Sequence, residues 1–66
     1  MIIPDKLIKK WSALRSEEDS KIIADNVGVT TQTVRNAFRE KKCSTAVFEG
    51  MASFYNKKAE LVKQYL

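Results

Sequence analysis

A glycine stands between two amphipathic patterns in the stretch from Ser20 to Arg39, and this feature limits the possible folds more than any other. Apolar residues recur at helical spacing before Gly28 and again after Thr31. Gly28 lies where the first helix must end and the chain reverse, a position that favours a left-handed backbone. That conformation costs a residue with a Cβ about 1 kcal/mol or more. Two short helices joined by a tight turn are therefore predicted.

The residues around this turn support the same arrangement. Ala24 and Val34 are spaced to face each other across the helix crossing, where a small side chain lets the two axes approach closely. Val29 provides an apolar plug beneath the turn. The Thr30 hydroxyl can accept a hydrogen bond from the free N–H groups of the following helix. Together these features predict a helix-turn-helix.

Each of the two helices has an apolar inner face, and the second has a polar outer face. The inner residues are Ile23, Val27, Val34, Ala37 and Phe38. The outer residues of the second helix are Thr31, Gln32, Arg35, Asn36 and Arg39. The outer set combines hydrogen-bonding groups with two cations.

Residues 16 to 40 resemble the helix-turn-helix of the small phage-repressor and Cro class of bacterial DNA-binding proteins. The segment I-A-D-N-V-G-V-T-T-Q-T-V, residues 23 to 34, is similar to that class's pattern I-A-x-x-x-G-V-(S/T)-x-x-(S/T)-V. Ala37 departs from the class, which more often has a larger aliphatic residue there, and the neighbouring Phe38 can fill that volume. The resemblance implies a sequence-specific double-stranded DNA-binding protein, a transcriptional regulator of repressor or Cro type.

In such a protein the second helix of the motif, about residues 31 to 40, enters the major groove. The Gln32 and Asn36 amides can pair bidentately with adenine, and Arg35 can reach guanine or phosphate. The Thr31 methyl group can contact thymine, which completes the expected base-reading set of Thr31, Gln32, Arg35 and Asn36. Contacts to the DNA backbone are expected from Ser20, Lys21, Thr30, Thr33, Arg39, Lys41 and Lys42.

The charge balance favours an acidic partner. Twelve Lys and Arg residues against eight Asp and Glu give a formal net charge of +4 and a pI near 9.4. Arg35, Arg39, Lys41 and Lys42, opposed by Glu40, gather cations on or just after the second helix of the motif. This placement favours contact with phosphate.

Length and composition exclude several other classes. A chain of 66 residues is one domain, and it buries roughly 60% of its unfolded surface. One cysteine and no histidine leave no intramolecular disulfide and no Cys/His metal site. We expect no cofactor and no enzymatic activity, because there is no nucleophile beside a base and no glycine-rich phosphate loop. With no apolar run near 18 residues and no signal-peptide pattern, we expect no membrane partner and a cytoplasmic, nucleoid-associated location.

Before the motif, the sequence predicts a helix from Pro4 or Asp5 to Leu14. Its apolar stripe is Leu7, Ile8, Trp11 and Leu14, with Trp11 as a core residue. Ser16 and Asp19 then form a capping-box pattern, and the acidic run Glu17, Glu18 and Asp19 is interpreted as a solvated cap of the next helix.

After the motif, apolar residues repeat at steps of three and four from Thr45 to Leu66, which favours one long helix of about 33 Å. Gly50 and Asn56 weaken this helix, and a break near Asn56 would divide it into two. The last turns then need a partner for Leu61, Val62, Tyr65 and Leu66. These residues either pack back on the first helix or form a two-fold dimer seam.

The predicted fold is all-α, a compact bundle of four helices, or five if the last segment breaks, in a single domain of residues 1–66. We expect a homodimer at least on DNA. The alternative function is a small helical protein-interaction module or phage accessory protein whose C-terminal helix is the working surface.

Overall fold

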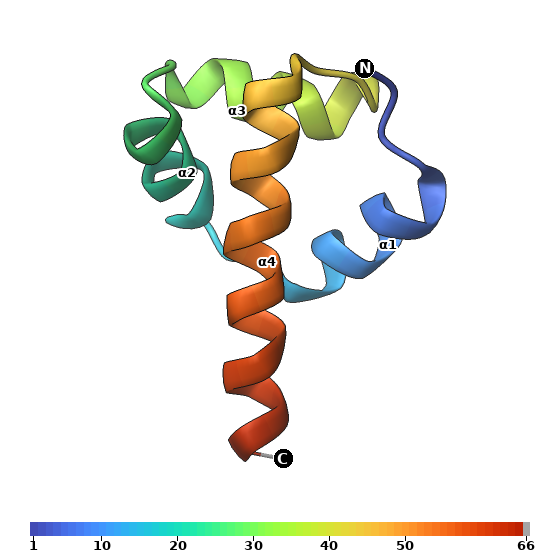
Figure 1. The fold of residues 1–66 in the computed structure, drawn as a ribbon, viewed down its shortest axis with the longest axis vertical. Coiled ribbons are helices and arrows are strands. Elements are labelled where there is room, and N and C mark those ends of the chain that lie inside the picture. The colour runs from blue at the N-terminus through green and yellow to red at the C-terminus, as the bar shows by residue number, and fades with distance from the viewer. Residues whose placement is uncertain (66) are drawn as a thin grey trace.

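The computed structural model describes residues 1–65, which form four helices and no strand apart from one isolated β-bridge (Figure 1). The helices are α1 (Asp5–Leu14), α2 (Asp19–Val27), α3 (Thr31–Glu40) and α4 (Thr45–Tyr65). The all-α prediction is confirmed, including the long C-terminal helix.

Helix α4 organises the molecule. In Figure 1 it runs the full length of the view, with α2 on one side, α1 on the other and α3 across its N-terminal end. It is continuous through Asn56, so the five-helix alternative is wrong. Its 21 residues span about 32 Å, and its last turns project beyond the other helices. No helix within residues 1–65 has the length and apolarity of a membrane span.

An aromatic cluster fills the centre between α1, α3 and α4. The rings of Trp11 and Tyr55 stack with their centroids 5.7 Å apart and their planes 16° from parallel. Phe38 meets Tyr55 edge-on at 6.0 Å, and Phe48 lies 5.7 Å from Trp11. Trp11 is buried, as predicted. Tilted and stacked aromatic pairs of this kind stabilise a core beyond their buried area, which matters in so small a domain.

The turn between α2 and α3 forms as the sequence predicts. Gly28 has a left-handed backbone (φ 84°, ψ 33°), and its N–H donates to the Ala24 carbonyl at 2.8 Å. The Thr30 hydroxyl accepts from the Thr33 N–H at 3.2 Å and so caps α3. Ala24 and Val34 are both buried. The Gly28 turn and the Thr30 cap together fix the orientation of α3 relative to α2.

The N-terminal residues hold the loop that follows α3. Ile2 forms an antiparallel bridge with Lys42, and the Ile3 N–H donates to the Lys41 carbonyl at 2.8 Å. The Ile3 side chain is buried in the core. The sequence does not predict this contact, because a bridge between segments this far apart leaves no local periodicity.

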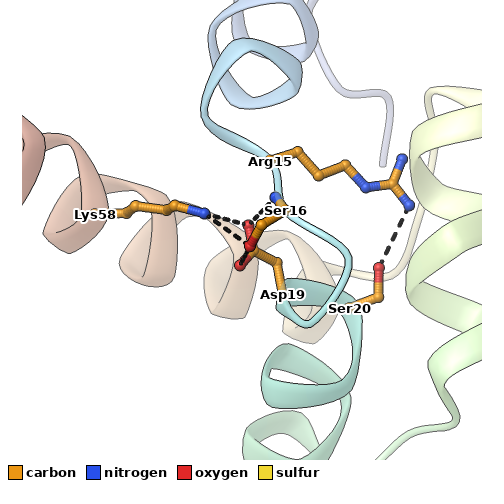
Figure 2. A network of polar contacts seen from close by, with 5 residues as sticks. All are labelled: Arg15, Ser16, Asp19, Ser20 and Lys58. Carbon is orange, nitrogen blue, oxygen red and sulfur yellow. Dashed lines mark hydrogen bonds and ion pairs between the residues drawn. The ribbon is translucent and has the colours of Figure 1, made fainter.

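The acidic run before α2 is only partly solvated, and for Asp19 the prediction of a solvated cap is wrong. Asp19 is 3% exposed, and its carboxylate accepts from Lys58 Nζ of α4 at 2.8 Å (Figure 2). It also accepts from the Ser16 N–H at 3.0 Å and the Ser16 hydroxyl at 2.8 Å. The residue therefore joins the start of α2 to the far half of α4.

Candidate nucleic-acid interface

The outer side of α3 carries the four predicted base-reading residues and Arg39, which was predicted to contact the DNA backbone. Gln32, Arg35 and Arg39 are exposed, while Thr31 and Asn36 are half-buried. They share this side because the opposite face of α3, formed by Val34, Ala37 and Phe38, is buried in the core. A helix of ten residues with one buried stripe leaves the rest of its circumference available to a partner.

Three of these side chains form a hydrogen-bonded row along α3. The Asn36 Oδ1 atom accepts from Gln32 Nε2 at 2.9 Å and from an Arg39 guanidinium nitrogen at 3.0 Å. The spacings of four and three residues place all three on adjacent helical turns. The row restricts the rotamers of Gln32 and Arg39 before any partner is bound.

The hydrogen bonds of this row leave different amide atoms available on Gln32 and on Asn36. Both lone pairs of Asn36 Oδ1 are used, whereas in the part of the chain that the structure describes no group bonds to the Oε1 acceptor or the second N–H of Gln32. A bidentate pair with adenine needs one acceptor and one donor on the same amide. Gln32 can make that pair without breaking the row, and Asn36 cannot.

Thr30 and Thr33 lie together at the start of α3. Their hydroxyl oxygens are 2.8 Å apart, and Thr30 also receives the Thr33 N–H. One hydroxyl hydrogen of the pair is used between them, so the other remains free to donate to a phosphate oxygen. This free donor lies beside the first turn of α3.

The predicted phosphate-binding lysines are exposed at both ends of the helix-turn-helix. Lys21 is exposed on α2, and Lys41 and Lys42 are exposed after α3. Lys41 has a left-handed backbone (φ 59°) and pairs with Asp5 at 3.3 Å, with both side chains largely exposed. An exposed pair of this kind is weak and exchanges readily for a phosphate.

The structure removes Ser20 from the predicted set. Ser20 is 1% exposed, and its hydroxyl accepts from an Arg15 guanidinium nitrogen at 3.5 Å (Figure 2). The helical pattern placed Ser20 near the polar start of α2, but the packing of α2 against the rest of the bundle buries this side chain. Arg15 occupies the surface above it instead.

Arg15 is a residue that the sequence interpretation missed. Its guanidinium carbon lies 4.3 Å from the centre of the Phe38 ring of α3. The residue lies between α1 and α2, outside the recognised motif pattern. The only signal in the sequence was an unpaired cation just before the acidic run, which does not reveal a neighbour 23 positions away.

The predicted dimerisation residues lie at the projecting end of α4. Leu61 is 56% exposed, Val62 38% and Tyr65 86%, while Leu66 lies outside the described residues. Val62 lines a shallow groove of about 540 Å³ against the end of α1, together with Lys10, Ala13, Leu14, Ala59 and Lys63. Val62 therefore faces the end of α1 across this groove, whereas Leu61 and Tyr65 remain largely uncovered.

Comparison with known proteins identifies no protein similar to this chain. No protein-family model matches this chain, and neither the curated proteins nor the solved structures give a significant match. The functional assignment therefore rests on the motif and on the geometry of α3.

Proposed function

We propose that this protein binds double-stranded DNA sequence-specifically and regulates transcription as a repressor or Cro-type protein, with α3 in the major groove. The observation that carries this proposal is the row of Gln32, Asn36 and Arg39 on the outer side of a capped helix that follows a Gly28 turn. An exposed helix with amide and guanidinium groups along one side matches the donors and acceptors of base edges.

The roles within the row differ. Gln32 reads adenine through its free acceptor and donor, as its hydrogen bonding allows. Asn36 is a positioning residue that orients Gln32 and Arg39. Arg39, Lys21, Lys41 and Lys42 supply cations for backbone phosphates, with the Thr30 and Thr33 hydroxyls at the start of α3. The protein acts on the nucleoid, in the cytoplasm.

The test begins with selection of a preferred duplex from a random pool, followed by affinity measurements on that duplex and on random DNA. Gln32→Ala should weaken binding to the selected site by roughly 1–3 kcal/mol and binding to random DNA much less. Asn36→Ala should cost a similar amount by releasing Gln32 and Arg39. Asn56→Ala, which removes an exposed amide of α4 outside both the proposed DNA surface and the proposed dimer surface, is the matched control and should leave both affinities unchanged.

Two results would count against the proposal. Equal losses on selected and random DNA would remove Gln32 from base reading. Absence of any retained duplex in a mobility-shift assay of mixed genomic fragments at low salt would oppose DNA binding altogether, since the phosphate contribution is greatest there.

A second candidate is a protein-interaction module that uses the end of α4. The exposure of Leu61 and Tyr65 favours it, because apolar side chains gathered on one projecting helix are typical of a contact surface. We assign this surface to a homodimer on DNA, since one helix-turn-helix reads only a short half-site.

A further inference from the structure

An open hollow separates the end of α1 from the flank of α3. Its volume is about 670 Å³, and it is lined by Ser12, Arg15, Ser16, Glu17 and Arg35. Arg15 and Arg35 come from the α1–α2 linker and from α3, so only the folded bundle brings them to one place. Among the described residues, neither guanidinium forms an ion pair with a carboxylate.

The Arg15 guanidinium is held by uncharged groups. It lies over the Phe38 ring, 4.3 Å from the ring centre. It also donates one N–H to the buried Ser20 hydroxyl (Figure 2). Phe38 and Ser20 are both buried, so this support belongs to the core and does not move independently. The cation–π contact and one neutral hydrogen bond hold the guanidinium in place, and within residues 1–65 no carboxylate pairs with its charge.

The residues lining the hollow suit a phosphodiester. Two guanidinium groups provide planar pairs of N–H donors, which match the oxygens of a phosphate, and the Ser12 hydroxyl adds a further donor. The Ser16 hydroxyl is already donated to Asp19. Glu17 is the one opposing charge, so the two arginines leave the lining with one excess positive charge.

We propose that this hollow holds one phosphate of the duplex backbone between Arg15 and Arg35, a contact that rests on the proposed DNA-binding function. Arg35 then serves phosphate and not guanine. Because Arg15 stacks on Phe38 of α3, the captured phosphate sets how far α3 enters the groove and where along the duplex it sits. The contact is independent of base sequence.

The first measurement is the salt dependence of binding to a random 20-bp duplex. Arg15→Gln should reduce the slope of log K against log salt by about 0.9, the value for one lost phosphate contact. Arg15→Lys should keep the slope but bind more weakly, because it retains the charge and loses the planar fork. Lys57→Gln removes one exposed charge from the far half of α4 and should leave the slope unchanged. Glu17→Gln should strengthen binding.

The second measurement locates the phosphate. Neutral methylphosphonates are placed one at a time along the selected duplex, and one position should weaken the wild-type protein while leaving Arg15→Gln unaffected. Thermal melting of each variant separates loss of this contact from loss of fold, since Arg15 also covers Phe38. Arg15→Lys, which keeps the aliphatic stem, provides the folded comparison.

The outcomes are distinguishable. An unchanged salt slope in a folded Arg15→Gln, with wild-type DNA binding intact, overturns the phosphate clamp and leaves the proposed function standing. A wild-type protein that retains no duplex overturns both. A third outcome combines two measurements: inorganic phosphate at constant ionic strength shifts the Arg15 Nε NMR resonance, and Arg15→Gln leaves the salt slope of DNA binding unchanged. The hollow is then a site for free anions, and the proposed phosphate contact with DNA is overturned.

Discussion

Asp19 is ionised although it is nearly buried. Burial alone raises the pKa of its carboxyl, but the hydrogen bond from Lys58, the two from Ser16 and the Lys58 charge outweigh burial and hold the pKa below the ordinary 3.8. The Tyr55 hydroxyl is buried nearby, and it has no hydrogen-bond partner among the described residues. Burial, followed by the negative charge of Asp19, raises the pKa of Tyr55, so this hydroxyl stays protonated.

Asp19→Asn should lower the free energy of unfolding at pH 7 by about 1–3 kcal/mol, because Lys58 and Ser16 lose a charged acceptor. A folded-state pKa below the unfolded value stabilises the protein above pH 3.8, and this contribution disappears as the pH falls through the folded-state pKa. The difference between wild type and variant, measured by urea unfolding, should therefore be full at pH 7 and shrink below pH 4.

Asp25→Asn provides the control on the same helix. Asp25 is exposed, so its substitution should change the free energy of unfolding by no more than about 0.5 kcal/mol. A difference between wild type and Asp19→Asn that stays constant from pH 7 to pH 2 would mean that the Asp19 charge contributes nothing to stability.

At the scale of elements, the crossing of α2 and α4 depends on one glycine. A Cβ on Gly50 of α4 would collide with the Val27 side chain of α2 and approach Ile23 within 3.9 Å. In the sequence, Gly50 appears only as a residue of low helix propensity within the predicted C-terminal helix. The structure gives its physical reason, since a missing side chain lets two helices approach closely.

Gly50→Ala should destabilise the protein despite the better helix propensity of alanine. The propensity gain is about 1 kcal/mol, and overpacking against the stiff, β-branched Val27 costs about 1–3 kcal/mol, so the net loss reaches up to about 2 kcal/mol. In a Val27→Ala background the added methyl has room, and the same substitution should stabilise the protein. Thermal melting followed by circular dichroism measures both. A higher melting temperature for Gly50→Ala in the wild-type background would contradict the close crossing.

At the scale of the whole molecule, the proposed DNA surface on α3 and the exposed apolar surface at the end of α4 lie far apart. Figure 1 shows α3 across one end of α4 and the free turns at the other. The proposed DNA surface and the exposed apolar residues Leu61 and Tyr65 therefore lie at opposite ends of the long axis. If the proposed two-fold dimer is joined through these turns, its two copies of α3 must reach half-sites about 34 Å apart to bind both.

Tyr65→Ser tests this assembly without disturbing the monomer, because Tyr65 is 86% exposed. If the ring is buried in a dimer, its loss should raise the dimer dissociation constant at least about tenfold, as measured by sedimentation equilibrium. Binding to a duplex with two half-sites should weaken, while binding to a single half-site should not. Asn56→Ala, an exposed position of α4 outside the proposed seam, is the control and should leave self-association unchanged. Unchanged self-association of Tyr65→Ser would place the seam elsewhere or show that there is none.

Local sequence signals were sufficient for the helices and their junctions. Apolar periodicity predicted the bounds of α1 and the continuity of α4, and Gly28 and Thr30 predicted the turn and the cap of α3. These features depend on residues within about one helical turn of each other, and that is the range over which periodicity, capping and left-handed backbone preference act. Trp11 was predicted as core for the same reason, since it lies on a clear apolar stripe.

The pairing of distant residues was decided only by tertiary structure. Asp19 meets Lys58 across 39 positions, Gly50 meets Val27, and Arg15 lies over Phe38. Periodicity tells which side of a helix is buried, but not the angle and offset at which that side meets another helix. For this reason the sequence predicts the two helices of the motif and the turn between them. The burial of Ser20, the ion pair of Asp19 and the hollow beside α3 depend instead on how the four helices pack.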